Sequence, residues 1–448
     1  MSTKNILLIG AGRSSNVLIR FLIDNRKKEN WEITIADANI EMIKGTLPTN
    51  EVKFQILNVN DEDACAQLVK KADIVISMVP AHLHMHVAKN CVKYSKNMVT
   101  ASYVSAEMQQ LNRDAQEKNI VLLNEIGLDP GLDHLSAMKI IDNLRASGAE
   151  MLNFESFAGG LLAPESEKEN PWKYKFTWNP RNVVLAGQGT VKFIQEGRYK
   201  YIPYHRLFRR TEIIEIEGYG RFEGYANRDS LKYLDAYNLR EIPTIYRGTL
   251  RRPGFCRAWN IFVQLGATDD SYTIEDSENM TYRQFINSFL TFNPTDSVEL
   301  KLMHYLHLDQ DSEIMEKLKW LGIFEDKKIG LTNATPAQIL QHILEDKWQL
   351  SPEDKDMIVM WHQFIYKLNG KTERKTSSMV VTGEDTINTA MAKTVGLPVG
   401  IATQLILQGK IKTSGVQIPT KPSIYEPILQ ALKPYGIHFN EATEDWNN

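Results

Sequence analysis

A glycine-rich turn near the start of the chain has the residue types that bind a dinucleotide. The run GAGRSS at 10–15 directly follows an apolar run and precedes a second apolar run with helical spacing. Gly10 permits a tight turn, Gly12 lets a pyrophosphate approach the backbone, and the N-terminus of the following helix supplies unpaired N–H groups. The turn therefore predicts cofactor contacts from Gly10, Gly12, Arg13 and Ser14, with a purely structural turn as the alternative.

An acidic residue follows this turn at the distance that a dinucleotide site requires. Asp37 lies 25 residues after Gly12, at the end of a second strand-like run. A carboxylate at this place accepts the ribose 2′-hydroxyl of NAD, whereas NADP sites usually have a basic residue. Arg13 could still reach a 2′-phosphate, and Asp37 could instead cap a helix. The cofactor is therefore NAD or NADP, and Asp37 favours NAD.

Three alternating histidines follow the strand-like run 73–79. His82 and His86 are four residues apart, a spacing that binds zinc on a helix, but no other ligand is near them in sequence. Strand ends of this kind usually pass over the cofactor, so we expect Val79 and Pro80 to contact it. The histidines then begin a helix beside the cofactor, and no metal site is expected.

Composition limits the class of protein further. The chain has 448 residues, 43% of them hydrophobic and 24% charged, with a net charge of −3. This near-neutral balance argues against a general nucleic-acid binder. Three cysteines outside any CxxC pair argue against a disulfide scaffold. No apolar run approaches the ~20 residues of a membrane span, and the start leads directly into a strand-like run, so we expect a cytoplasmic enzyme.

The first 135 residues alternate short apolar runs with helical stretches, as βαβ units do. Several runs are apolar without alternation, which is typical of strands buried on both faces of a parallel sheet. The expected strands are 5–9, 33–36, 53–57, 73–79, 98–101 and 121–124. The fold class is therefore α/β, with a Rossmann-type doubly wound parallel sheet.

The later sequence predicts a mixed α/β substrate domain with a helical insertion. We assign 1–135 to the dinucleotide-binding domain, 136–280 to the substrate domain, 281–370 to the insertion and 371–384 to a strand that returns to the substrate domain. Within these ranges we expect strands at 212–216, 258–265 and 375–382, and helices at 282–292, 297–308, 335–345 and 354–368. An amphipathic helix at 385–408 and the tail to 448 are expected to pack back on the first domain.

Five segments are too unusual to be generic. They are ASYVS at 101–105, NEIGLDPGLDH at 124–134, GYANRDS at 224–230, GTLR at 248–251 and AKTVGLP at 392–398. Together they resemble the saccharopine dehydrogenases that form L-glutamate, also called saccharopine reductases. The resemblance covers most of the chain, and the run at 124–134 is its most specific part.

The resemblance implies a reversible reaction in lysine metabolism. Saccharopine is oxidised at the carbon bound to its secondary amine, hydride passes to NAD(P), and the imine is hydrolysed to L-glutamate and 2-aminoadipate 6-semialdehyde. It also implies a homodimer. One departure concerns the cofactor, because the fungal members use NADP and have a basic residue where this chain has Asp37.

The resemblance places Ser102 and Tyr103 at the end of the fifth strand, facing the substrate. Leu128 and Asp129 leave the sixth strand at the same edge, where open α/β sheets bind ligands. Asp129 could orient an amine or accept a proton from it or from water, so Asp129 and Tyr103 are the expected catalytic residues. His134 follows directly and ranks below Asp129, because a histidine there more often packs at a helix start.

Saccharopine has three carboxylates, so its enzyme needs several cationic or donor groups. Arg228 lies in the Asn-Arg-Asp motif with Asn227, and Thr249 could add a hydroxyl; we expect these three to bind substrate. Other nearby arginines, at 209, 210, 247 and 252, lie outside the motifs and are expected at the surface. Phe176, in a loop that resembles the family's interdomain loop, is expected to touch the nicotinamide end of the cofactor.

Two other functions stay open. Carboxynorspermidine dehydrogenases share the architecture, but their substrate has fewer carboxylates, which the arginine cluster disfavours. A non-catalytic cofactor-binding regulator on the same fold is the second, and Tyr103, Asp129 and Arg228 argue against it.

Overall fold

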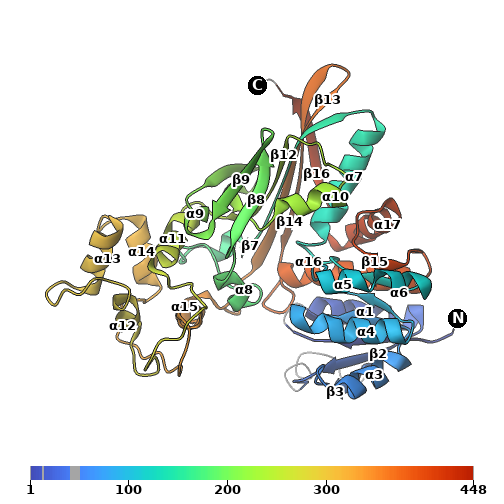
Figure 1. Ribbon diagram of the computed structural model, residues 1–448, viewed down its shortest axis with the longest axis horizontal. Helices are drawn as coiled ribbons and strands as arrows, with labels where there is room; N and C mark the ends of the chain where they lie inside the picture. The colour runs from blue at the N-terminus through green and yellow to red at the C-terminus, as the bar shows by residue number, and fades with distance from the viewer. Residues whose placement is uncertain (1, 13–14, 41–50, 447–448) are drawn as a thin grey trace. The chain divides into compact units, whose positions relative to one another are not determined.

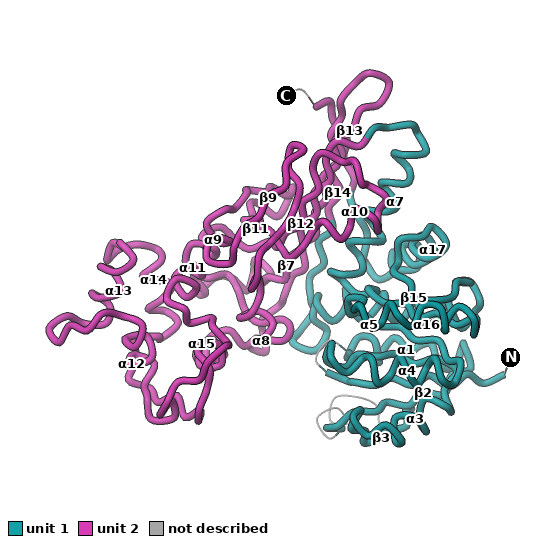
Figure 2. Tube along the Cα trace, viewed as in Figure 1, with its two compact units in different colours: residues 1–150, 379–440 teal, residues 151–378, 441–448 magenta. Residues whose placement is uncertain are grey.

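The computed structural model describes residues 2–12, 15–40 and 51–446. The chain divides into two compact units (Figure 2). Unit 1 comprises Met1–Glu150 and Met379–Asn440, and unit 2 comprises Met151–Ser378 and Glu441–Asn448. The division differs from the predicted one, because the helices of the expected insertion belong to unit 2 together with the substrate sheet.

Unit 1 is built on a parallel sheet. Within the described residues, seven strands follow the order β15-β6-β5-β4-β1-β2-β3, and every neighbouring pair is parallel. The strands are β1 (Lys4–Ile9), β2 (Trp31–Asp37), β3 (Lys53–Ile56), β4 (Ile74–Ser77), β5 (Asn97–Val99), β6 (Val121–Leu123) and β15 (Gly415–Gln417). The order 3-2-1-4-5-6 is that of a Rossmann sheet, which confirms the predicted fold class.

Helices cover both faces of this sheet (Figure 1). Leu7, Ile9 and Val75 share a buried cluster with Cys65 of α3 and Val87 of α4. Successive strand residues point to opposite faces, so Leu8 and its alternate neighbours face the layer that contains α1 and α16. The helices of unit 1 are α1 (Asn16–Glu29), α3 (Glu62–Lys71), α4 (His84–Lys93), α5 (Ala106–Gln110), α6 (Asn112–Glu117), α7 (Leu132–Ala146), α16 (Ala390–Leu407) and α17 (Pro422–Leu432), with short 3₁₀ turns η3 (Ala81–Leu83) and η6 (Lys433–Tyr435).

Helix α16 belongs to unit 1, where we expected it to pack, but it is buried on most sides and not only along one amphipathic face. It begins after the N-cap Thr389, and most of its residues are buried on all sides. Among the described helices, α16 alone has the length and composition of a membrane span, but 78% of it is buried, as in the core helix of a soluble protein. Gly396 and Gly400 make a close approach possible, because a Cβ atom there would meet Leu18 or Phe21 of α1.

Unit 2 contains a mixed sheet. Within the described residues, nine strands form it in the order β10-β11-β12-β7-β13-β14-β16, and β8 and β9 extend it from β12. The pair β12–β7 is parallel, and β10–β11 and β11–β12 are antiparallel. The strands are β7 (Glu150–Leu162), β8 (Thr190–Gln195), β9 (Arg198–Pro203), β10 (Thr211–Ile216), β11 (Gly220–Ala226), β12 (Thr244–Arg251), β13 (Asp356–Leu368), β14 (Lys371–Thr382) and β16 (Asn440–Asp445).

Two predicted elements of this unit were wrong in type. The expected strand at 258–265 is part of helix α11 (Phe255–Leu265), whose large apolar side chains Phe255, Trp259 and Phe262 recur at helical spacing between two left-handed glycines. The expected helix at 354–368 is strand β13, where buried and partly buried residues alternate from Met360 to Tyr366. In both cases an apolar run was assigned the wrong period.

Unit 2 has an aromatic core to which α11 (Phe255–Leu265) and α15 (Pro336–Trp348) contribute. Trp348, at the end of α15, lies 5.3 Å from Trp172 and 5.9 Å from Trp259 between ring centroids, and all three rings are buried. The helices are α8 (Pro180–Val184), α9 (Tyr204–Leu207), α10 (Tyr233–Ala236), α11, α12 (Tyr282–Asn287), α13 (Val298–Leu306), α14 (Glu313–Trp320) and α15 (Pro336–Trp348), with 3₁₀ turns η4 (Pro164–Ser166) and η5 (Ser230–Lys232).

We predict that Gly396→Val destabilises the protein, because an ideal Cβ at this position lies 2.8 Å from the backbone nitrogen of Leu18. Overpacking of this kind typically costs about 1–3 kcal/mol, so the melting temperature should fall by several degrees in calorimetry. Gly400→Ala is the matched control: its added Cβ meets the side chain of Phe21, which has more freedom to shift, and should cost less. Equal stability of Gly396→Val and wild type would contradict the close packing of α16 on α1.

Candidate active site

The glycine-rich turn lies where the strand order of unit 1 reverses, between β1 and β4. Gly10 has φ +89°, and a Cβ atom on it would lie 2.7 Å from the backbone carbon of Met78, the first residue after β4. Gly12 has nothing within 4 Å of an ideal Cβ, so there is open space beside its backbone. This switch point is where open α/β sheets bind dinucleotides. Arg13 and Ser14 lie outside the described residues.

The Asp37 carboxylate is held by backbone groups on two sides. Its Oδ2 accepts the N–H of Ala11 at 2.8 Å, and its Oδ1 accepts the N–H of Asn39 at 2.8 Å. The carboxylate therefore links the end of β2 to the glycine-rich turn. Each oxygen keeps a further lone pair for a ligand hydroxyl.

The loop after β4 contains the predicted cofactor contacts Val79 and Pro80. Val79 is 8% exposed and Pro80 is exposed at the start of η3. His82 is exposed in η3, whereas His84 is buried at the start of α4. Among the described residues, no group of three or more His, Cys, Asp or Glu side chains could hold a metal ion.

His84 connects the ends of two neighbouring strands, a contact that the sequence did not reveal. Its Nδ1 lies 2.8 Å from the hydroxyl of Ser77 at the end of β4, and its Nε2 lies 2.7 Å from the hydroxyl of Ser102 after β5. Burial, with a smaller contribution from His82, lowers the pKa of His84 to about 4. The ring is therefore neutral at physiological pH.

The two predicted catalytic residues are in direct contact. The Tyr103 hydroxyl donates to Asp129 Oδ1 at 3.1 Å, and both side chains are half-buried. Asp129 follows Leu128 in a compact loop that is closed by the bond from the N–H of Gly127 to the carbonyl of Pro130, 2.9 Å long. The structure thus places Ser102 and Tyr103 after β5 and Leu128 and Asp129 after β6, and it joins Tyr103 to Asp129.

A buried hydrogen-bonded pair, Glu125 and His134, supports the same loops. Glu125, 7% exposed and at φ +56°, accepts the N–H of Val104 at 3.0 Å, and its other oxygen lies 2.8 Å from Nε2 of His134. His134 is fully buried at the start of α7. This agrees with a packing role for His134, and Glu125 is a supporting residue that sequence analysis missed. The signal in the sequence was the carboxylate of Glu125, which follows Asn124 between the apolar residues 120–123 and 126–128.

The three predicted substrate ligands of unit 2 share one pair of strands. Asn227 and Arg228 follow β11, and Thr249 lies in β12, which pairs with β11 in antiparallel register. The Asn227 N–H donates to the carbonyl of Arg247 at 2.9 Å. Arg228 is exposed and has φ +53° in the turn after β11.

The surface prediction for the other arginines was partly wrong. Arg209 and Arg210 are exposed, but Arg247 and Arg252 are 4% and 8% exposed. Arg247 stacks 3.9 Å from the ring centroid of Tyr233, and Arg252 donates to Glu167 at 2.6 Å. Buried arginines are found where an aromatic face or a carboxylate compensates the charge, which sequence spacing does not show.

Phe176, the expected nicotinamide contact, is 2% exposed in the aromatic core of unit 2. Its ring centroid lies 5.3 Å from that of Trp348 and 6.3 Å from that of Tyr174. The structure therefore shows a packing role for Phe176, and a contact with the cofactor stays a prediction.

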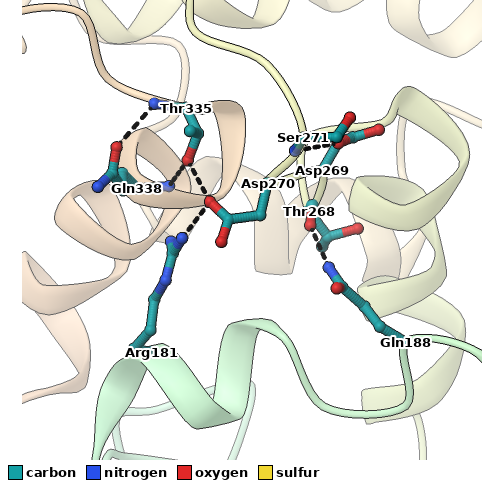
Figure 3. A network of polar contacts seen from close by, with 8 residues as sticks. All are labelled: Arg181, Gln188, Thr268, Asp269, Asp270, Ser271, Thr335 and Gln338. Carbon is teal, nitrogen blue, oxygen red and sulfur yellow. Dashed lines mark hydrogen bonds and ion pairs between the residues drawn. The ribbon is translucent and has the colours of Figure 1, made fainter.

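A hollow of about 520 Å³ in unit 2 has no predicted site residue in its lining. Figure 3 shows the polar network beside it, in which Asp270 accepts from Thr335 and pairs with Arg181. Gln188 donates to the carbonyl of Thr268 at 2.8 Å. These contacts join α8, the loop after α11 and the start of α15, so the network has a structural role.

Two family models match the chain. Residues 6–123 match the saccharopine dehydrogenase NADP binding domain, and residues 127–437 match the saccharopine dehydrogenase C-terminal domain. The matched nucleotide domain contains the glycine-rich turn, Asp37 and Ser102. The second match begins at the loop of Asp129 and covers Arg228 and Thr249.

Individual relatives agree with these models. The chain is 33% identical to saccharopine dehydrogenase [NADP(+), L-glutamate-forming] of Saccharomyces cerevisiae, over 98% of this chain and 99% of that protein. It is 35% identical to the mitochondrial alpha-aminoadipic semialdehyde synthase of Rattus norvegicus over 98% of this chain, and it spans about half the length of that relative (48%). The structure of apo saccharopine dehydrogenase (L-Glu forming) from S. cerevisiae superposes with a TM-score of 0.89 at 32% identity, covering 98% of this chain and 100% of that one. The chain therefore belongs to the saccharopine dehydrogenase family and carries its NAD(P)-binding domain.

Proposed function

We propose that the chain interconverts saccharopine with L-glutamate and 2-aminoadipate 6-semialdehyde by NAD(P)-dependent hydride transfer, in lysine metabolism. The contact between Tyr103 and Asp129, at the ligand-binding edge of a dinucleotide-type sheet, carries this proposal. The names of the relatives from S. cerevisiae and R. norvegicus support the reaction and one of its products. The expected homodimer and cytoplasmic location stay predictions.

The residues at the switch point fit a dinucleotide. Gly12 leaves open space where a pyrophosphate would approach, and Asp37 lies at the end of β2 with lone pairs for a ribose hydroxyl. When bound, NAD(P) supplies the hydride acceptor. Backbone groups of Gly10 and Gly12 and the Asp37 side chain would hold it, and the other expected contacts are Arg13, Ser14, Val79, Pro80, Leu128 and Phe176.

Asp129 is the proposed proton acceptor. Its carboxylate accepts a hydrogen bond from Tyr103, which fixes the orientation of the group. An ionised carboxylate accepts a proton from the secondary amine of saccharopine, or from the water that hydrolyses the imine. Tyr103 thereby positions Asp129 and contributes a second polar group to the same edge.

Arg228, Asn227 and Thr249 are the proposed carboxylate ligands. A guanidinium forms two parallel hydrogen bonds to a carboxylate, and Arg228 is exposed beside Asn227. A substrate with three carboxylates needs several such donors, and the hydroxyl of Thr249 on the neighbouring strand adds one. Ser102 is the corresponding proposed ligand in unit 1.

The two glycines of the nucleotide turn give a matched pair of variants. Gly10→Ala should lower the melting temperature of the apo protein, because of its positive φ and the 2.7 Å approach to Met78. Gly12→Ala should leave that temperature unchanged and weaken NAD(P) binding about tenfold or more, since its Cβ would occupy space for the pyrophosphate. Calorimetry and binding titration measure both effects. Unchanged cofactor affinity in Gly12→Ala would refute a dinucleotide at this turn.

Asp37 should make NAD the preferred cofactor, because its carboxylate accepts a ribose hydroxyl and repels a 2′-phosphate. Asp37→Asn keeps an oxygen for one of the two backbone contacts and removes the charge. We expect the ratio of kcat/KM for NAD to that for NADP to fall about tenfold in this variant. A wild-type enzyme that uses NADP better than NAD would contradict this role of Asp37.

Absorbance of the reduced nicotinamide, with saccharopine and either nucleotide at alkaline pH, tests the function itself. Asp129→Asn should lower kcat by about 100-fold or more with cofactor affinity unchanged. Arg228→Ala should raise the KM of saccharopine more than tenfold without changing the KM of the cofactor. Arg209→Ala, an exposed arginine outside the motifs, is the control. No wild-type turnover with either nucleotide would overturn the proposal, and an unchanged KM in Arg228→Ala would remove that residue from the substrate site.

A further inference from the structure

Three side chains form a hydrogen-bonded row across the ends of β4 and β5. The Ser77 hydroxyl lies 2.8 Å from His84 Nδ1, and His84 Nε2 lies 2.7 Å from the Ser102 hydroxyl. Ser77 is fully buried and His84 is 4% exposed, whereas Ser102 is half-buried. The row therefore begins in the core of unit 1 and ends at a hydroxyl that a ligand can reach.

The protons of this row have one favourable arrangement. The pKa of His84, lowered to about 4 by burial and by His82, leaves the ring neutral, so only one of its two nitrogens carries a proton. Among the described residues, His84 Nδ1 is the one hydrogen-bond partner of the Ser77 side chain. If Nδ1 carried the proton, the oxygen of the buried Ser77 would accept a hydrogen bond from Nδ1, and the Ser77 hydroxyl proton would have no acceptor. An unsatisfied buried donor is costly, so Ser77 donates to Nδ1 and the proton is on Nε2.

This arrangement determines what Ser102 can offer a ligand. With the proton on Nε2, His84 donates to the Ser102 oxygen, and the Ser102 proton points away from the ring. We propose that Ser77 and His84 act as positioning residues that make Ser102 a hydrogen-bond donor to a carboxylate oxygen of the substrate. The opposite tautomer would make Ser102 donate to His84 and would leave only lone pairs for the ligand.

The proposal rests on the proposed function and extends it to the polarity of the site. Tyr103, next to Ser102, donates to the Asp129 carboxylate, so Asp129 presents an acceptor. Ser102 then presents a donor on the loop after β5 that also carries Tyr103, the hydrogen-bond partner of this acceptor. A substrate with an amine and a neighbouring carboxylate on one carbon has the complementary pair of groups. The row thus selects an amino acid-like end of the substrate over an amine without a carboxylate.

A double-mutant cycle tests whether His84 acts through Ser102. Ser102→Ala and His84→Leu should each raise the KM of saccharopine about tenfold, with kcat changed less than threefold and the KM of the cofactor unchanged. In the Ser102→Ala background, His84→Leu should then have little further effect on KM, because its route to the substrate has been removed. His84→Gln, whose amide can donate to Ser102 and accept from Ser77, should restore most of the affinity. Independent, multiplying effects of the two substitutions would overturn the positioning role.

The tautomer can be read without any activity. In ¹⁵N-labelled protein, the His84 signals are identified by their loss in His84→Gln, and they should show a protonated Nε2 and an unprotonated Nδ1 at pH 7. Ser77→Ala should weaken this preference and raise the KM of saccharopine, whereas His86→Leu on the same helix should change neither. A proton on Nδ1 would overturn the proposal even in an active enzyme. Absence of saccharopine turnover in the wild type, with the Nε2 proton present, would instead overturn the proposed function and the substrate assigned to Ser102.

Discussion

The buried carboxylate of Glu125 is the contact on which the candidate active site depends. It accepts the N–H of Val104 at 3.0 Å, its second oxygen lies 2.8 Å from His134, and its own N–H donates to the carbonyl of Ser102 at 3.0 Å. One residue therefore fixes the loop after β5 to the loop after β6 and to the start of α7. A buried carboxylate that loses such partners is strongly unfavourable, so these loops keep one arrangement. Tyr103 and Asp129 meet within it.

Much of unit 1 could be predicted from the sequence, because its local signals agree with its tertiary structure. A strand of a buried parallel sheet can be recognised from its own apolar run, without knowledge of the strand that it pairs with. The order of the strands follows from the short right-handed connections between them. The ends of such strands lie along one edge, so the positions of Gly10, Asp37, Ser102 and Asp129 in the sequence are enough to place them on the same edge of the sheet. The roles of Ser102 and Asp129 came from the family motifs, since spacing alone does not distinguish a catalytic carboxylate from a turn residue.

The contacts that could not be predicted depend on partners distant in sequence. Ser77, His84 and Ser102 belong to three different elements, and nothing local shows that a histidine at a helix start bridges two serines. The buried arginines are similar: Arg247 is stabilised by the ring of Tyr233, a neighbour created by the sheet and the turn after it. Burial of a polar group requires its partner, and the partner is a product of the fold.

Of the two hydrogen bonds made by Ser102 and Tyr103, one leaves a donor for the substrate and the other leaves an acceptor. An amino acid substrate requires both, a donor for its carboxylate and an acceptor for its amine. Tyr103 donates a hydrogen bond to Asp129, and the carboxylate keeps further lone pairs to accept from a substrate amine. In the proposed tautomer, His84 donates a hydrogen bond to the Ser102 oxygen, so the Ser102 hydroxyl donates to the substrate. Ser102 and Asp129 do not by themselves determine which group donates and which accepts, because a serine hydroxyl can do either and a carboxylate can be protonated. For Ser102 the direction comes from the buried Ser77 and His84 behind it, because the other tautomer leaves the Ser77 hydroxyl proton without an acceptor. For Asp129 it comes from the half-buried Tyr103 hydroxyl.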